Sequence, residues 1–206
     1  MKKVLCLFAF FLATATSFAQ NIEEVDSVYA DSVSDMNYYL YEAMEAQRVT
    51  EICGVKFGTS YETAKRILEN KYGDAEYDYS HSKQIITFNN KNYAGIYFDA
   101  IHFLFQSDGH KTYMNCCIFI IDTNTAEEAK KKREILHQRL SEKYYMETRT
   151  DDNGFKYYLG GLSPLDNRYA FYIDVLKYGR EVARNHHYPY AARLYYGPYD
   201  YVKEEF

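Results

Sequence analysis

The sequence predicts an α+β fold: two tandem units, each a helix followed by a four-strand antiparallel meander, that form one broad curved sheet with both helices packed on one face. Two observations predict this fold. Two amphipathic segments, residues 59–72 and 125–145, share one helical design, and each is followed by short, alternating apolar strands. A helix with one apolar stripe needs a sheet face to bury it, and each half of the chain supplies such a sheet.

The N-terminus has the pattern of a secretory signal peptide. Lys2 and Lys3 precede the apolar run Val4–Ala13, and the small residues Ser17 and Ala19 suit a cleavage site after Ala19. The run is shorter than the roughly 20 apolar residues that a transmembrane helix needs. We therefore expect an exported protein, periplasmic or secreted, that loses residues 1–19. An uncleaved anchor or a buried helix is the alternative.

Charge and length narrow the class of protein. The chain has 24 Lys and Arg against 29 Asp and Glu, and loss of Lys2 and Lys3 leaves 22 basic residues and a net charge of about −7. Nucleic-acid binding relies on basic side chains that neutralise phosphates, so no nucleic-acid partner is expected. Residues 20–48 read as an acidic leader with a short helix at about 35–48, and residues 49–206 as one domain.

The two main helices carry recognisable end signals. Thr59 with Glu62, and Thr125 with Glu128, form capping boxes, and Gly73 ends the first helix. The apolar stripes are Tyr61, Ala64, Ile67, Leu68 and Tyr72 in the first helix, and Ala129, Leu136, Leu140 and Tyr144 in the second.

Four strands are expected after each helix, giving unit one at about 51–122 and unit two at about 123–202. The strands of unit one are 84–88, 93–98, 100–105 and 113–121, with turns at 89–91 and 108–109. Those of unit two are 146–150, 155–159, 168–176 and 192–202, with a turn at 152–154. Gly197-Pro198 interrupts the last strand, as at an edge or a bulge.

Two tandem α-β4 units resemble the β-lactamase-inhibitory-protein-like fold. The stretch "GVKFGTSYETAKRIL" also looks like the opening of small exported bacterial proteins, including the outer-membrane-assembly lipoproteins. The resemblance covers about residues 51–202, but the chain lacks one disulfide per unit and a lipobox. It implies a sheet whose open face engages a protein, and it transfers no site residue.

The Asp108-Gly109 turn predicts which side chains share a face. A two-residue loop would place Phe103 opposite Met114, and the side-chain period of two then sorts the residues. The face toward the helices would carry Ile101, Phe103, Phe105, Met114, Cys116, Ile118 and Ile120, and in unit two Tyr169, Phe171, Ile173 and Val175. The open face would carry His102, Leu104, Tyr113, Asn115, Cys117 and Phe119, and in unit two Arg168, Tyr172 and Asp174.

This mixed aromatic and polar face is the expected partner-binding surface, because tyrosine offers a large rigid area and a hydroxyl at little entropic cost. The candidate residues are His102, Leu104, Tyr113, Asn115, Cys117, Phe119 and Tyr172. The leading hypothesis is a non-enzymatic module that binds another envelope or extracellular protein, to inhibit or scaffold it. Tyrosines that fill the edge of a thin core, or that the N-terminal helix covers, are the alternative.

The sequence is also compatible with two other classes of function. Tyr195, Tyr196, Tyr199 and Tyr201 could form a platform for sugars, giving a glycan-binding module, and Arg193 beside Tyr195 could form a cation–π pair. An enzyme with a Cys117 thiolate beside His102 and Asn115 comes third, because a flat sheet offers nothing to stabilise the thiolate.

The remaining cysteines and histidines favour no cofactor. Cys53 could form a disulfide with Cys116 or Cys117, and three buried thiols are the equally consistent reading. His186-His187 lacks zinc-ligand spacing, and a polar loop explains it better. No metal, catalytic or cofactor site is predicted.

Overall fold

The computed structural model describes residues 38–80, 83–107, 109–152 and 154–201. The chain forms two compact units, Met1–Ala43 and Met44–Phe206. Residues 38–45 are helical, within the short helix expected at about 35–48. The predicted signal peptide and most of the acidic leader lie outside the described residues. All that follows concerns the second unit.

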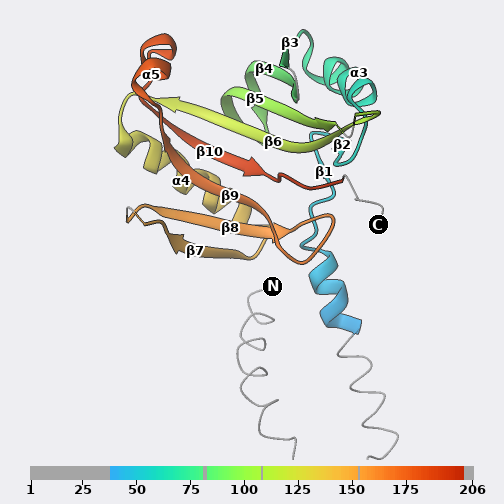
Figure 1. The fold of residues 1–206 in the computed structure, drawn as a ribbon. Helices are drawn as coiled ribbons and strands as arrows, with labels where there is room; N and C mark the ends of the chain where they lie inside the picture. Colours follow the sequence, from blue (N-terminus) through green and yellow to red (C-terminus); the bar gives the residue numbers. More distant parts are fainter. Residues whose placement is uncertain (1–37, 81–82, 108, 153, 202–206) are drawn as a thin grey trace, which may run out of the picture. The chain divides into compact units, whose positions relative to one another are not determined.

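The second unit alternates helices with groups of strands (Figure 1). Its first half contains β1 (Glu51–Ile52), β2 (Val55–Lys56), α3 (Tyr61–Tyr72), β3 (Glu76–Ser80), β4 (Lys83–Tyr93), β5 (Ile96–Ser107) and β6 (Thr112–Thr123). Its second half contains α4 (Ala126–Ser141), β7 (Met146–Thr150), β8 (Lys156–Leu162), β9 (Tyr169–Lys177), α5 (Arg180–His186) and β10 (Tyr190–Tyr196).

Eight of the strands form one antiparallel sheet in the order β3-β4-β5-β6-β10-β9-β8-β7. Each of the helices α3 and α4 is therefore followed by a four-strand meander, and the two meanders join where β10 pairs with β6. Helix α3 packs on β4 and β6, and α4 packs on β6, β9 and β10. In Figure 1, α4 lies behind β9 and β10. The predicted α+β fold, with helices on one face, is confirmed.

The core lies between the helices and one face of the sheet. The strand register aligns two rows of side chains on that face across the molecule. One row is Tyr77, Ile86, Phe103, Cys117, Tyr196, Phe171, Gly160 and Met146, and the other is Phe88, Ile101, Phe119, Leu194, Ile173, Tyr158 and Thr148. Leu68 of α3 and Leu136 of α4 belong to the same buried cluster.

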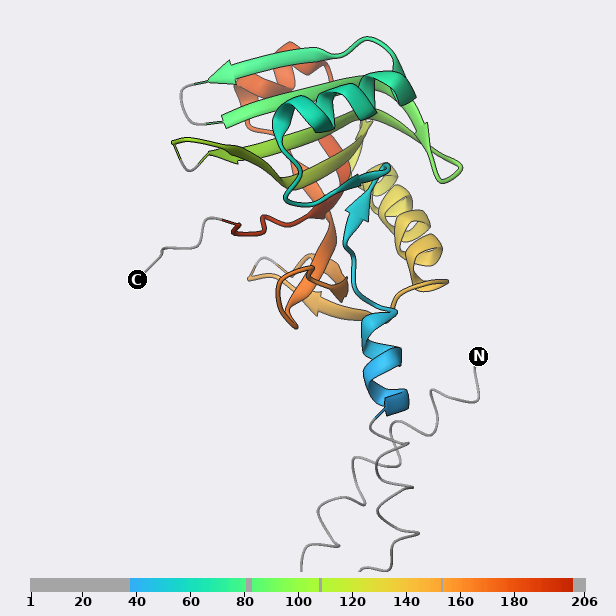
Figure 2. The ribbon, with the colours of Figure 1, turned by 90° about the vertical axis from the view of Figure 1, so that its right-hand side faces the viewer.

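The segment before α3 also belongs to this core. Val49, Ile52, Val55 and Phe57 are buried in it, and Figure 2 shows the β1–β2 hairpin between the two helices. Backbone hydrogen bonds join Val49 N–H to the Leu162 carbonyl and Leu162 N–H to the Gln47 carbonyl. This segment therefore ties the start of the unit to the end of β8.

The two helices begin differently. In α4 the Thr125 side chain accepts a hydrogen bond from Glu128 N–H, as the capping box predicts. In α3 the N-cap is Ser60, not Thr59, and its side chain makes no capping hydrogen bond. The first capping box is therefore wrong. Gly73 ends α3 as expected, but with φ 81° and ψ −145° it is not in the left-handed helical conformation.

Three expectations for the strands of unit one are wrong. Residues 76–80 form β3, which the sequence analysis missed. Residues 89–91 lie inside β4, and the turn to β5 is formed by Ala94 and Gly95, both with positive φ. The two predicted strands 93–98 and 100–105 are therefore not separate strands. Tyr93 is the last residue of β4, and residues 96–105 belong to the single long strand β5.

The β5–β6 hairpin departs from the predicted register in two places. Ser107 pairs with Thr112 instead of His110, so the connecting loop has four residues, 108–111. Next, Phe105 pairs with Met114 while Leu104 pairs with Cys116, so Asn115 is an extra residue, a β-bulge. Beyond the bulge the faces exchange: Cys117 and Phe119 point into the core, and Cys116, Ile118 and Ile120 lie on the other face.

The C-terminal segment holds this bulge. Tyr199 N–H donates to the Asn115 carbonyl at 2.9 Å, and Tyr199 Oη donates to the Ala170 carbonyl at 2.7 Å. Gly197 has φ 86°, and a Cβ at that position would lie 2.3 Å from the Asn115 carbonyl oxygen. The interruption predicted at Gly197-Pro198 is confirmed, although β10 is a central strand and not an edge. Beyond Gly197 the chain continues alongside β6 (Figure 1).

Candidate functional site

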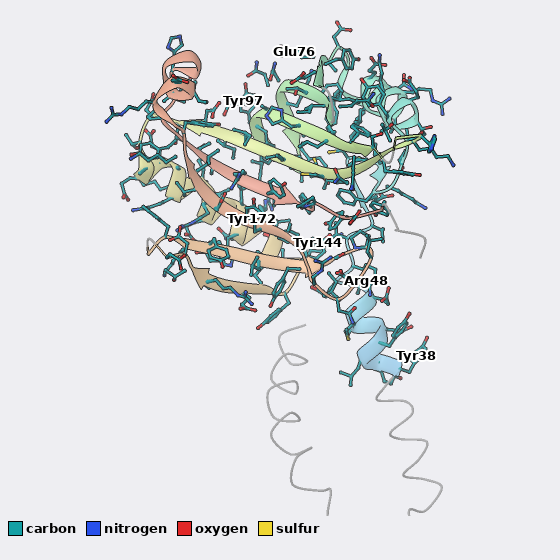
Figure 3. All side chains as sticks on the ribbon, in the orientation of Figure 1. Tyr38, Arg48, Glu76, Tyr97, Tyr144 and Tyr172 are labelled. Atoms are coloured by element: carbon teal, nitrogen blue, oxygen red, sulfur yellow. The ribbon has the colours of Figure 1, made fainter. Side chains whose placement is uncertain are left out.

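The candidate site is the open face, defined as the side of the eight-stranded sheet opposite α3 and α4. The register aligns one row of side chains on it across all eight strands. In strand order the row is Glu76, Thr87, His102, Ile118, Tyr195, Tyr172, Leu159 and Glu147. Figure 3 labels Glu76 at one edge of the sheet and Tyr172 near its middle.

The centre of the open face is an aromatic stack with an arginine. The Tyr172 and Tyr195 rings are stacked with their centroids 4.8 Å apart and an angle of 15° between the planes. The Arg193 guanidinium lies 5.3 Å from the Tyr172 ring centroid and 5.5 Å from that of Tyr195. The cation–π pair expected between Arg193 and Tyr195 is present.

Asp174 fixes this arginine in place. Arg193 Nε donates to one carboxylate oxygen at 3.0 Å, and a terminal guanidinium nitrogen donates to the other at 2.6 Å. A two-point contact of this kind restricts both side chains. Because both side chains are mostly buried, the pair is held with little freedom before any partner arrives. We call Tyr172, Asp174, Arg193 and Tyr195 the central cluster.

The tyrosines of the central cluster are neutral groups with restrained hydroxyls. Burial raises the pKa of Tyr172, and burial together with a hydrogen bond to Cys116 raises the pKa of Tyr195. Both phenols therefore remain protonated across the physiological range and can donate or accept hydrogen bonds. They supply a large, rigid and amphipathic surface.

The unit-one side of the open face is less aromatic. His102 Nδ1 and Thr87 Oγ1 are 2.9 Å apart, and Leu104 is half-buried beside them. The Asn115 side chain donates to Gln106 Oε1 at 3.4 Å, and Tyr113 pairs with Gln106. These four predicted residues, His102, Leu104, Tyr113 and Asn115, lie on the open face with Tyr172.

Two predicted members of the face are wrong. Cys117 and Phe119 are fully buried in the core, because the bulge at Asn115 inserts one residue and reverses the alternation after it. Cys116, Ile118 and Ile120 take the open side instead, the opposite of the sequence prediction. The inward assignment of Ile101, Phe103, Phe105 and Met114 is confirmed by their burial.

In unit two, Phe171 and Ile173 are buried as expected, but Tyr169 is exposed. The reason is its place at the first residue of β9, where its hydroxyl reaches Glu147 of the edge strand. Arg168 lies just before β9 and pairs with Asp166 in the preceding loop, so it contributes nothing to the central cluster.

The arrangement of cysteines contradicts the thiolate hypothesis. Cys117 and His102 lie on opposite faces of the sheet, and burial raises the pKa of Cys117 well above its ordinary value. The three described cysteines form no disulfide with one another, and all three are buried. Cys53 and Cys117 belong to the core on the helix side of the sheet, whereas Cys116 lies on the open side. A disulfide from Cys53 to Cys116 would therefore have to cross the sheet.

The four C-terminal tyrosines do not form a sugar platform. Tyr196 and Tyr199 are only 2% and 3% exposed, and Tyr201 packs on Gly58 on the helix side. Of these four tyrosines, Tyr195 alone lies on the open face. The segment therefore has no row of exposed rings on which successive sugars could stack. Strand alternation places Tyr196 inward, and Tyr199 is buried in the same core beyond Gly197.

The described residues also contain a hollow at the molecular surface. A pocket of about 340 Å³ lies between the first turn of α3 and the β5–β6 hairpin, lined partly by Gln84, whose Oε1 has no described partner. It lies away from the central cluster. Across the described ranges no group of three or more His, Cys, Asp or Glu side chains could hold a metal ion. The same residues include no helix with the length and hydropathy to span a membrane.

Sequence reasoning missed the importance of Arg193 and Leu159 for this face. Arg193 was noted only for its neighbour Tyr195, because nothing in the sequence reveals that β10 inserts between β6 and β9. The alternation Arg193-Leu194-Tyr195 was the available signal for two polar-ended side chains on one side of a strand. Comparisons with protein-family models, with curated proteins and with solved structures return no match to this chain.

Proposed function

We propose that this chain is an exported, non-enzymatic module that binds another envelope or extracellular protein through the open face of its sheet, to inhibit or scaffold that partner. The signal-peptide pattern supports export. The acidic net charge argues against a nucleic-acid partner. The order of a helix and four strands, repeated once, is the feature on which the likeness to the β-lactamase-inhibitory-protein-like fold rests.

The observation that carries the proposal is the central cluster. Tyr and Arg are the side chains most enriched in the residues that dominate binding energy at protein interfaces. Here two tyrosines and an arginine are stacked at the middle of an extended face and held by Asp174 before binding. Preorganisation of this kind lowers the conformational entropy lost on association.

The surroundings of the cluster also suit a protein partner. Leu104, Ile118 and Leu159 give apolar area around it, and His102 and Thr87 add polar groups toward one end. Interfaces commonly combine an apolar and aromatic centre with a polar rim. A face of this breadth fits a folded surface better than a small molecule, which needs a concave pocket.

Site-specific photocrosslinking tests the proposal. A photoreactive phenylalanine analogue is placed at Leu104 or at Tyr172 on the open face, and at Lys132 on the exposed side of α4 as the matched control. Envelope and culture-medium fractions of the producing organism then supply the partner. We expect both open-face positions to crosslink to the same protein and the α4 position not to do so.

The central cluster supplies the second arm of the test. Tyr195→Ala and Arg193→Ala, each combined with the photoreactive group at Leu104, should lower the crosslinked yield about tenfold or more, as loss of a residue central to an interface does. Circular dichroism would verify that the variants fold. Equal yields from the open face and from α4, or a yield that both variants leave unchanged, would contradict the proposal.

A further inference from the structure

The sheet ends in two edge strands of very different charge. No described residue pairs with the outer side of β3 or of β7. An exposed edge strand presents unpaired backbone groups that can accept another strand. Whether an edge pairs with a second copy of itself depends on the side chains that such pairing would place opposite one another.

Strand β7 is self-complementary. If two copies pair antiparallel with Thr148 opposite itself, Glu147 of each copy lies opposite Arg149 of the other, and Met146 lies opposite Thr150. Opposite charges at directly opposed positions stabilise an antiparallel pair. Within one copy the two side chains already form an ion pair, Arg149 Nε to Glu147 Oε1 at 2.6 Å, and both remain partly exposed. Two copies would thus assemble four alternating charges.

Strand β3 has the opposite character. It carries Glu76 and Asp78 at the same spacing, two residues apart. Antiparallel self-pairing centred on Tyr77 would place these carboxylates opposite each other twice, which is unfavourable. Charges on an edge strand are a known protection against such pairing. One edge of the sheet is therefore protected against a second copy and the other is compatible with it.

Exposed aromatic side chains flank β7 at both ends. Tyr145 precedes the strand and is 62% exposed, and Phe155 follows the turn after it and is 49% exposed. Antiparallel pairing brings the start of one β7 beside the end of the other, so Tyr145 of one copy meets Asp151 of its partner, next to Phe155. Both aromatics would lose exposed area on association, which favours it.

We propose that β7 is a homodimerisation edge, through which two copies of this chain pair antiparallel about Thr148 and join their sheets into one. Opposed residues of an antiparallel pair share a face, so both open faces lie on the same side of the joined sheet. The dimer presents two copies of the central cluster on one face, separated by β8 and β7 of each copy. Since β7 has only five residues, the dimer is weak and forms as the concentration rises.

Charge exchange at the edge tests the proposal. Glu147→Arg puts arginines at both positions, and Arg149→Glu puts glutamates at both, so each variant opposes like charges in its own dimer. The two variants mixed together restore both opposite-charge pairs. Sedimentation equilibrium of the full mature chain, over a wide concentration range at low salt, would give the mass of each sample and of the equimolar mixture.

We expect the wild-type mass to rise toward twice the monomer value, and each single variant to have a dissociation constant at least about tenfold higher. The equimolar mixture and the Glu147→Arg/Arg149→Glu double variant should both regain dimer. Arg139→Glu on α4 makes the same charge change on a side chain away from the edge and should dimerise like the wild type.

Three results would overturn the inference. They are a wild-type chain that stays monomeric throughout, single variants that dimerise as well as the wild type, and a mixture that associates no better than its components. Dimerisation lost on Tyr195→Ala but retained in both edge variants would place self-association on the open face and equally reject the β7 edge. Since none of these readouts depends on an external partner, the outcome is separate from that of the proposed function.

Discussion

At the scale of single residues, Gly197 is the position where the backbone leaves least freedom. Its φ of 86° disfavours any side chain, and an added Cβ would lie 2.3 Å from the Asn115 carbonyl oxygen, a backbone atom that cannot move aside cheaply. We expect Gly197→Ala to lower the free energy of unfolding by about 2 kcal/mol or more. Urea denaturation followed by circular dichroism measures this change.

Gly73 provides the matched control for that substitution. It has a φ of 81°, close to that of Gly197, but no atom lies within 4 Å of the added Cβ. Gly73→Ala should therefore cost only the penalty of this backbone region (φ 81°, ψ −145°), on the order of 1–3 kcal/mol and less than Gly197→Ala. Equal losses for the two variants would show that the close contact with the Asn115 bulge contributes nothing.

The buried thiols give a second prediction at this scale. Burial raises the pKa of Cys53 to about 11 and that of Cys117 well above its ordinary value, which lowers the thiolate fraction at neutral pH. We expect Cys53 to react with iodoacetamide about a hundredfold more slowly in the folded chain than in urea, because each pKa unit lowers the thiolate fraction tenfold. Cys117 should also react more slowly in the folded chain, because its thiol is fully buried and its pKa is raised well above the ordinary value. Mass spectrometry of the alkylated peptides distinguishes them. Rapid alkylation of Cys117 in the folded protein would revive a reactive-cysteine function.

At the scale of elements, the helices were predictable because their signals are local. The apolar stripe of α3 and its terminal Gly73, and the Thr125-to-Glu128 box of α4, each involve residues within a few positions of one another. The start of α3 was misassigned, α4 ends at Ser141 instead of residue 145, and α5 was not predicted. The Thr59 carbonyl accepts a hydrogen bond from Met114 N–H of β6, so Thr59 is held beside the sheet and the helix begins after Ser60. A tertiary contact overrode a local capping signal.

The strands were less predictable because their faces depend on distant contacts. A period of two is exact only until one residue is inserted, and the bulge at Asn115 is stabilised by Tyr199, which lies 84 residues further along the chain. The residues next to Asn115 in the sequence carry no signal that predicts this bulge. Half of β6 was therefore assigned correctly and half was inverted, which moved Cys117 and Phe119 from the candidate site into the core.

The unequal helix starts lead to a prediction for the elements themselves. Thr125 accepts a hydrogen bond from Glu128 N–H, so Thr125→Ala removes a cap and should lower the free energy of unfolding by about 1 kcal/mol. Ser60, the N-cap of α3, makes no such bond, so Ser60→Ala should cost clearly less. Chemical denaturation of the two variants compares them directly. A larger loss at Ser60 than at Thr125 would contradict the assigned caps.

At the scale of the whole molecule, the decisive feature is the junction of the two meanders through β6 and β10. It makes one sheet from two halves and places Tyr195 and Arg193 beside Tyr172 and Ile118, so the candidate site exists only in the joined sheet. Sequence patterns predicted α3, α4 and one sheet shared by the two halves, but they missed β1, β2, β3 and α5. The pairing of β10 with β6 and β9 has no local signal in the sequence. Tyr172 was predicted on the open face, but its contact with Arg193 and Tyr195 therefore was not.

The same packing buries many tyrosines and should make the folded unit sensitive to alkali. Burial is the first cause that raises the pKa of each of these phenols: to about 12 for Tyr93, Tyr158 and Tyr201, and further for Tyr72, Tyr178, Tyr195, Tyr196 and Tyr199. In the unfolded chain tyrosines titrate near pH 10, so above about pH 10 the unfolded state binds fewer protons than the folded state. Stability is then complete below that pH and falls as the pH rises further.

Tyr196 and Tyr199 are the two most buried of these phenols. Proton linkage predicts that each lowers the free energy of unfolding by about 1 kcal/mol between about pH 10 and about pH 11. Urea denaturation at several pH values across this range measures the total. Tyr196→Phe removes one of the protons involved, so its free energy of unfolding should fall less steeply with pH than that of the wild type. Tyr39→Phe, outside the second unit, serves as the control and should leave the slope unchanged. A free energy of unfolding that stays constant to about pH 11, or a slope that Tyr196→Phe does not alter, would mean that these side chains are hydrated and that β10 does not turn Tyr196 into the core.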